Sequence, residues 1–77
     1  MQTWKNAEKS LIKDFEFSDF SEALEFVSKV GELAQKEDHH PDILIHDYSK
    51  VKVILTTHSE DGVTEKDHSL AEKINNI

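Results

Sequence analysis

The chain has 77 residues, with nine basic and sixteen acidic side chains, five histidines and no cysteine, and its net charge is −7. A chain of this length forms one domain, here residues 1–77, and buries only about 60–65% of the surface that it exposes when unfolded, which favours self-association. The negative charge repels a phosphate backbone and argues against direct binding of DNA or RNA. The absence of cysteine excludes disulfides and thiolate chemistry.

The sequence indicates neither a signal peptide nor a membrane span. The N-terminal stretch MQTWKNAEKS has no apolar region of the kind found in signal peptides. No apolar run approaches the roughly 18–20 residues needed to cross a bilayer. We therefore expect a cytoplasmic protein that does not enter membranes.

Two strands are predicted first in chain order. From Leu11 to Phe17, apolar and charged residues largely alternate, which is typical of a strand with one buried face. Trp4 is a candidate start of a partner strand, because the polar run 5–10 is long enough to turn the chain back.

A helix is predicted to begin near residue 19 and to end at about 38–40. Asp19, followed three residues later by Glu22, resembles a capping box. Pro41 disfavours the α conformation at His40 and so ends the helix. The apolar residues at helical spacing are expected to face the core, and they are Phe20, Ala23, Leu24, Val27, Val30, Leu33 and Ala34.

Residues 43–47 and 51–57 are predicted to form two further strands, joined by a tight turn at about 48–50. If the second strand stays regular, His58 falls at its end on the face of Lys52, because side chains alternate between the two faces of a strand.

A final helix is predicted after Thr64, which forms a second capping-box pattern with Asp67. Asp67 could serve only in this box, or could also present a carboxylate at the mouth between strand and helix, and both roles can hold together. The buried stripe of this helix is expected to be Leu70, Ala71, Ile74 and Ile77. The order β-β-α-β-β-α predicts an α+β fold, with helices packed on one face of a four-stranded antiparallel sheet.

Three of the five histidines lie at ends of predicted elements, namely His39, His40 and His58. Histidine titrates near neutral pH, so a cluster can donate one proton and accept another in a single turnover. Alternatively they are surface residues, since the helix dipole favours histidine near a helix C-terminus. A metal site is not expected, because there is no HExxH motif and no cysteine to complete a zinc set. His46 and His68 are assigned no role.

A motif of fixed intervals runs through residues 39–67. It consists of His-His-Pro, an aromatic residue after six intervening residues, a histidine after nine more and an aspartate after a further eight. The residues that carry it are His39, His40, Pro41, Tyr48, His58 and Asp67. This pattern resembles the signature of the pterin-4a-carbinolamine dehydratases, also known as dimerisation cofactors of a homeodomain transcription factor. The likeness continues upstream through Trp4, FEF, FSDFSEALEFV and ELA, so it covers nearly the whole chain.

The resemblance implies dehydration of 4a-hydroxytetrahydrobiopterin, a by-product of aromatic amino acid hydroxylases, to quinonoid dihydropterin without metal or cofactor. Carried over residue by residue, it makes His39, His40 and His58 the acid, base and pterin-orienting groups, in an order left open. Asp67 would hydrogen-bond one of these histidines or the substrate.

Four residues are assigned to the substrate side of the site by the same resemblance. Trp4 would wall the pterin pocket or be a buried packing residue, Pro41 would fix the direction of the histidine pair, and Tyr48 would pack at its turn. Gln35 stands where the family usually has an ionisable residue. If the helix reaches residue 39, the Gln35 amide can hydrogen-bond His39 but supplies no charge, so we expect an effect on rate rather than on the reaction.

The resemblance also implies partners. Family members form dimers through their sheets and tetramers from those dimers, and the strand 43–47 is a candidate edge for such pairing. A pterin-dependent hydroxylase in the same pathway would supply the substrate. The alternative function is a non-catalytic binding or dimerisation module, but a pure scaffold would not need the histidine and aspartate spacing.

Overall fold

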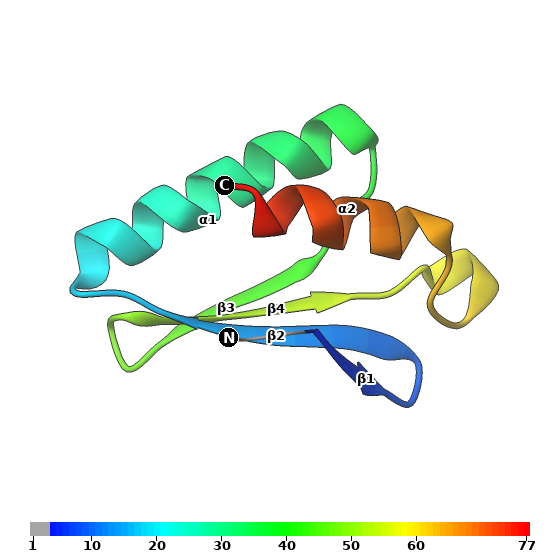
Figure 1. The fold of residues 1–77 in the computed structure, drawn as a ribbon, viewed down its shortest axis with the longest axis horizontal. Helices are drawn as coiled ribbons and strands as arrows, with labels where there is room; N and C mark the ends of the chain where they lie inside the picture. The colour runs from blue at the N-terminus through cyan, green and yellow to red at the C-terminus, as the bar shows by residue number, and fades with distance from the viewer. Residues whose placement is uncertain (1–3) are drawn as a thin grey trace.

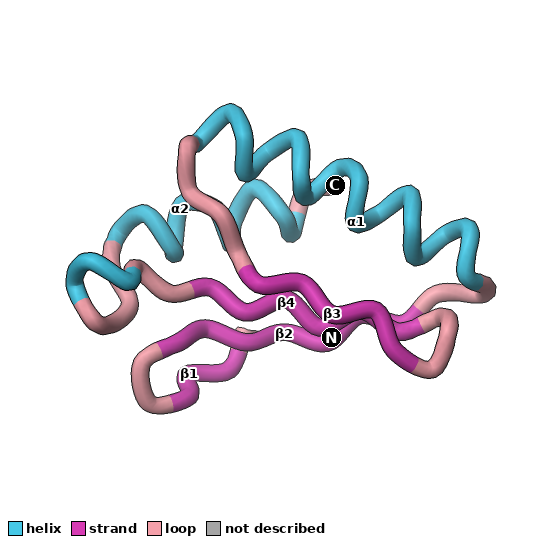
Figure 2. The backbone as a smooth tube through the Cα atoms, turned by 180° about the vertical axis from the view of Figure 1, so that it is seen from behind, coloured by secondary structure: helices cyan, strands magenta, loops and turns pink. Residues whose placement is uncertain are grey.

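The structure is a computed structural model that describes residues 4–77. Figure 1 shows both helices lying side by side on one face of the sheet, and Figure 2 shows the same two layers from behind. The predicted α+β fold is therefore confirmed. The elements in chain order are β1 (Lys5–Ala7), β2 (Ser10–Glu16), α1 (Phe20–Glu37), β3 (Asp42–His46), β4 (Lys50–Leu55), the short 3-10 helix η1 (His58–Glu60) and α2 (Glu65–Asn75).

The sheet has the strand order β1-β2-β4-β3, and all neighbours are antiparallel. β4 is central and alternates strictly: Val51, Val53 and Leu55 are buried beneath the helices, while the residues between them face the other side. β3 is an edge strand, as the sequence predicts for this segment. The sheet therefore delivers the chain after β4 to the end of the molecule where α1 finishes (Figure 1).

α1 begins and ends at identifiable caps. The side chain of Asp19 accepts a hydrogen bond of 2.9 Å from the backbone N–H of Glu22, while Glu22 accepts from Ser18 rather than from Asp19. The helix ends at Glu37, slightly earlier than predicted, because Asp38 adopts the left-handed conformation with φ 52°. The N–H groups of Asp38 and His39 then close the last turn, so His39 leaves the helix direction.

The capping hydrogen bond at Asp19 stabilises the fold by a measurable amount. Asp19→Ala is expected to lower the unfolding free energy by about 1 kcal/mol, because the N–H of Glu22 loses its acceptor. Urea unfolding followed by circular dichroism checks this, with Ser21→Ala in the exposed first turn as the control. An equal loss in both variants would contradict a capping role.

The core lies between the sheet and the inner faces of both helices. Phe26 is 8% exposed and packs against Phe15 and Phe17, with ring centroids 4.5 and 5.0 Å away. The other buried helix residues are Ala23, Val30 and Ala34 in α1, and Leu70, Ala71 and Ile74 in α2. No helix within residues 4–77 is long and apolar enough to span a bilayer.

Three residues predicted to be buried are not. Phe20, Leu24 and Ile77 are 48%, 46% and 45% exposed. In α1, the positions that face the sheet are 23, 26, 30 and 34, which leaves Phe20 and Leu24 on the flank of the helix. Ile77 follows the last residue of α2, where the helical register no longer directs it to the core.

Candidate active site

Three segments meet at one end of the molecule: the chain leaving α1, η1 with the residues around it, and the start of α2 (Figure 1). The left-handed Asp38 turns the chain out of α1, and Pro41 then leads it into β3. The capping box of Thr64 and Asp67 begins α2 at the same end, as predicted. Residues far apart in the sequence thereby face a common region.

Asp67 is the centre of this region. It is completely buried, and its carboxylate accepts hydrogen bonds from three groups. Oδ1 lies 2.6 Å from His39 Nε2, and Oδ2 accepts from the Thr57 hydroxyl at 2.7 Å and from the Thr64 backbone N–H at 2.9 Å. Because an ionised carboxylate only accepts, His39 Nε2 carries the proton of this contact.

The pKa of the Asp67 carboxyl is lowered from its ordinary value of 3.8. Burial raises this pKa, but the hydrogen bonds from His39, the Thr64 backbone and Thr57, together with the charge of a protonated His39, outweigh it. Asp67 is therefore a fixed negative charge at neutral pH. The His39 side chain, 12% exposed, is held against that charge.

His40 has a different partner. Its Nε2 lies 2.7 Å from the amide oxygen of Gln35, at an exposed site. The predicted contact between Gln35 and His39 does not form, because α1 stops at Glu37 and His39 is no longer one turn above Gln35 on the helix. The amide oxygen accepts the Nε2 proton of His40, which leaves Nδ1 as the acceptor of the neutral ring.

His58 lies at the same end of the molecule but outside this network. The predicted strand ends early, at Leu55, and His58 begins η1 instead of continuing on the face of Lys52. Backbone hydrogen bonds between Thr57 and Gly62 close the loop that redirects it. The exposed His58 side chain makes no hydrogen bond or ion pair within residues 4–77.

Trp4 and Tyr48 are not brought to the histidine pair. The indole N–H of Trp4 donates to Asn75 at 3.0 Å, near the C-terminal end of α2, eight residues and about 12 Å along the helix from Asp67. Tyr48 is 66% exposed in the turn after β3, whose five residues lead about 17 Å away from His40. Both side chains lie remote from Asp67 within one chain.

Thr57 is the member of the network that the sequence reading missed. It is 6% exposed, and its hydroxyl joins Asp67 to the hydroxyl of Thr64, 2.8 Å away. The alternation of Val51, Val53 and Leu55 carries Thr57 to the same inner face. A buried hydroxyl needs a hydrogen-bond partner, so the inward position of Thr57 in this alternation is the sequence signal that could have identified it.

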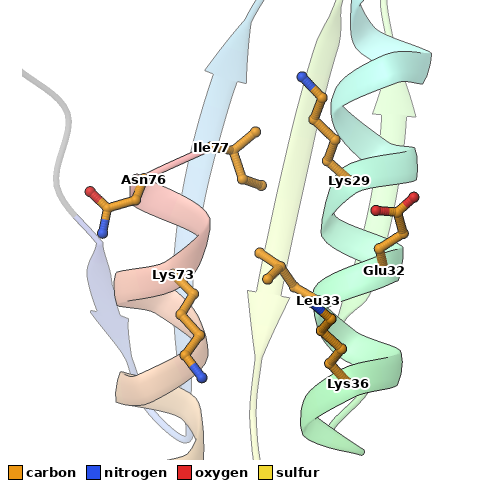
Figure 3. A pocket seen from close by; sticks show the side chains of 7 residues that line it. All are labelled: Lys29, Glu32, Leu33, Lys36, Lys73, Asn76 and Ile77. Carbon is orange, nitrogen blue, oxygen red and sulfur yellow. The ribbon is translucent and has the colours of Figure 1, made fainter.

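One surface hollow lies away from His39, His40 and His58. This groove of about 310 Å³ lies between α1 and α2 (Figure 3). It is lined by Lys29, Glu32, Leu33, Lys36, Lys73, Asn76 and Ile77. Within residues 4–77, no group of three or more histidine, cysteine or acidic side chains is placed to hold a metal ion.

Comparison with known proteins identifies the family. The sequence profile described as Pterin 4 alpha carbinolamine dehydratase matches residues 1–77. The chain belongs to this dehydratase family. A relative from Sulfolobus acidocaldarius, whose name provisionally assigns it to the same dehydratase, is 47% identical over 77 residues, covering 100% of this chain and 84% of the relative. The family resemblance predicted from the motif is thus confirmed.

Two solved structures are similar to this dehydratase-family chain. A Brucella melitensis protein described as a transcriptional coactivator/pterin dehydratase has a TM-score of 0.88 and 40% identity, over 95% of this chain and 79% of that one. A pterin dehydratase-like protein described as a RuBisCO assembly factor in the alpha-carboxysome has a TM-score of 0.80 over 96% of this chain and 87% of its own. At 19% identity, the second comparison establishes the fold alone.

Proposed function

We propose that this protein dehydrates 4a-hydroxytetrahydrobiopterin to quinonoid dihydropterin by histidine acid-base catalysis. Membership of the family and the names of its relatives support the pterin dehydratase activity. The single observation that carries the mechanism is the pair of adjacent imidazoles with unlike partners. His39 is bound to the buried carboxylate of Asp67, and His40 to the neutral amide of Gln35.

Unlike partners favour unlike protonation states. A carboxylate stabilises an imidazolium by charge, whereas an amide oxygen accepts a hydrogen bond without adding charge. We therefore assign the general acid to His39 and the general base to His40. His58, exposed at the same end, is proposed to orient the pterin.

The reaction requires two proton transfers. The bond between C4a and the hydroxyl oxygen breaks, and the departing hydroxyl takes the Nδ1 proton of a protonated His39 and leaves as water, while Nε2 keeps its proton on Asp67. The adjacent ring N–H gives its proton to His40, and the electron pair of that N–H bond forms the C=N double bond. Two histidines meet these requirements, and positioned acid and base groups each accelerate such steps about 10²–10⁴-fold. A pterin-dependent aromatic amino acid hydroxylase would supply the substrate.

The remaining residues act around this pair in the proposal. Gln35 orients His40, and Pro41 fixes the backbone that follows it. Trp4 is given a packing role beside Phe15, whereas Tyr48, which is 66% exposed, is given no role at the histidine pair within one chain.

The proposed activity is tested by generating 4a-hydroxytetrahydrobiopterin enzymatically and following its loss in the ultraviolet, with and without this protein. Acceleration by the wild type that falls about 100-fold in His40→Ala supports dehydration. Sedimentation of both proteins shows whether the variant keeps its fold and assembly. No acceleration by the wild type would overturn the proposal and leave the non-catalytic binding module as the better reading.

Gln35→Glu tests the neutral partner of His40. We expect turnover to be unchanged or higher, and the alkaline part of the pH-rate profile to gain most. A carboxylate at position 35 makes His40 a stronger base, but near neutral pH it also keeps the His40 ring protonated and so unable to accept a proton. Steady-state rates from pH 6 to 9 check this, with Gln35→Ala as the variant that removes the acceptor. A fall at every pH would mean that the amide itself is required.

We further propose that the protein forms a homodimer or homotetramer through the free edge of β3. This edge strand presents backbone N–H and C=O groups on its outer side, and Leu44 on it is 52% exposed. Sedimentation at micromolar concentration is expected to give a dimer or larger. The mass of a single chain would contradict this assembly.

A further inference from the structure

The hydroxyl groups of Thr57 and Thr64 form a chain with a defined direction. Each hydroxyl has one proton to donate. Thr57 donates its proton to Asp67 Oδ2, so the proton between the two hydroxyls, 2.8 Å apart, comes from Thr64. Thr64 in turn accepts from the backbone N–H of Lys66 at 3.3 Å. Every group in this chain points its donor toward the carboxylate.

This direction has a consequence for His39. Oδ2 of Asp67 accepts from Thr57 and from the Thr64 N–H, which leaves Oδ1 to accept from His39. The buried carboxylate cannot rotate without breaking these bonds. Hydrogen bonds in a row also polarise one another, which strengthens the last one. The orientation of Asp67, and through it that of the His39 ring, is therefore set from the Thr57 side.

We propose that Thr57 is a positioning residue of the reaction, which holds Asp67 in the one orientation that accepts the proton on His39 Nε2 and so leaves Nδ1 of that ring to face the substrate. This assignment rests on the proposed function for its catalytic consequence. Thr57 touches Asp67 and not the histidine, and its side chain is nearly inaccessible at 6% exposure, so it acts on catalysis only through the carboxylate.

The other charged or titratable groups of the surrounding elements do not bond to Asp67 within residues 4–77. Lys73 and Glu37 pair with each other across the two helices, and Asp61 pairs with Lys9. The remaining groups near this end are exposed, and they are Asp38, His40, His58, Glu60, Glu65, Lys66 and His68. The buried hydrogen bonds of Asp67 thus come from His39, Thr57 and Thr64 alone in the described part of the chain.

The test compares Thr57→Val with Thr57→Ser. Valine keeps the shape and removes the hydroxyl, and serine keeps the hydroxyl. We expect Thr57→Val to lower kcat about tenfold with KM nearly unchanged, and Thr57→Ser to recover kcat to within about twofold. Thr56→Val is the matched control, because this residue beside Thr57 loses a hydroxyl hydrogen bond of the same 2.7 Å length, which it donates to the backbone oxygen of Lys9.

A second readout follows the carboxylate itself. In carbon NMR titrations, the pKa of Asp67 is expected to rise in Thr57→Val and to stay low in Thr57→Ser and Thr56→Val, because one lowering hydrogen bond is lost only in the first. Nitrogen shifts of His39 report whether its neutral ring keeps the proton on Nε2. These measurements need no substrate, so they judge the positioning of Asp67 even if the wild type proves inactive.

The outcomes separate cleanly. Wild-type kcat and an unchanged Asp67 titration in Thr57→Val would overturn the inference, as would equal losses in the valine and serine variants. If the valine variant does not fold, the wild type still decides: its Thr57 hydroxyl proton is expected to exchange slowly with water. A rapidly exchanging hydroxyl proton overturns the inference.

Discussion

His39→Gln is expected to lower kcat for 4a-hydroxytetrahydrobiopterin dehydration about 10²–10⁴-fold, the usual contribution of a positioned acid or base. The glutamine amide can still donate a hydrogen bond to Asp67, so the buried carboxylate keeps a partner. It cannot deliver a proton at neutral pH. The change therefore removes acid catalysis while preserving the interaction that stabilises the fold. Rates from the ultraviolet assay, with thermal unfolding in parallel, check this.

His68→Ala is the matched control for this variant. His68 adjoins Asp67 in α2 but is exposed, and it was assigned no role from the sequence. Its removal is expected to leave kcat within about twofold of the wild type, because surface substitutions away from special contacts have small effects. A comparable loss in both variants would show that kcat responds to any histidine removed here, and would contradict the assignment of His39.

Asp67→Asn is expected to produce the largest loss of stability among these variants, about 2–4 kcal/mol. The asparagine fills the same space, but its amide nitrogen is a donor that faces Thr57 and Thr64 or His39, all of which also donate. At least one donor then faces another donor, with no acceptor between them, in a completely buried site. Urea unfolding at pH 7 measures the difference.

The same difference depends on pH with a definite sign. The pKa of Asp67 is lowered in the folded protein, so its contribution to stability is fully present above the unfolded value near 3.8 and is lost as the pH falls through the folded value. The gap between wild type and Asp67→Asn should therefore shrink as the pH falls below 3.8. Asp61→Asn, an exposed and ion-paired aspartate, should show almost no gap at neutral pH. A gap that widens as the pH falls below 3.8 would contradict the role given to Asp67.

The elements of the fold were predictable because their signals are local. Alternation identified β2 and β4, and the pattern from Thr64 to Asp67 identified the capping box that begins α2. The exposed positions of Phe20 and Leu24 were not predictable in this way, since both fit a helical apolar stripe. Which part of a wide stripe meets the sheet depends on how the helix is tilted and packed, which is a tertiary property.

The contacts at the candidate site were predictable for some residues but not in their pairing. The motif named His39, His40 and Asp67, yet the helical spacing suggested that Gln35 contacts His39. The left-handed Asp38 exchanges the partners, because it ends α1 before His39. A single backbone conformation at a non-glycine residue is weakly encoded in the sequence. The resemblance left open whether Asp67 bonds a histidine or the substrate, and the structure gives His39 as its partner across 28 residues.

The dependence of kcat/KM on pH for the wild-type protein tests the acid-base account most directly. One group that must be protonated and one that must be neutral predict a bell-shaped profile, with one limb altered in His39→Gln and the other in Gln35→Glu. A dehydration rate that is accelerated equally at every pH from 5 to 9 would contradict the account. Proton transfer by two histidines could not then be the origin of the acceleration.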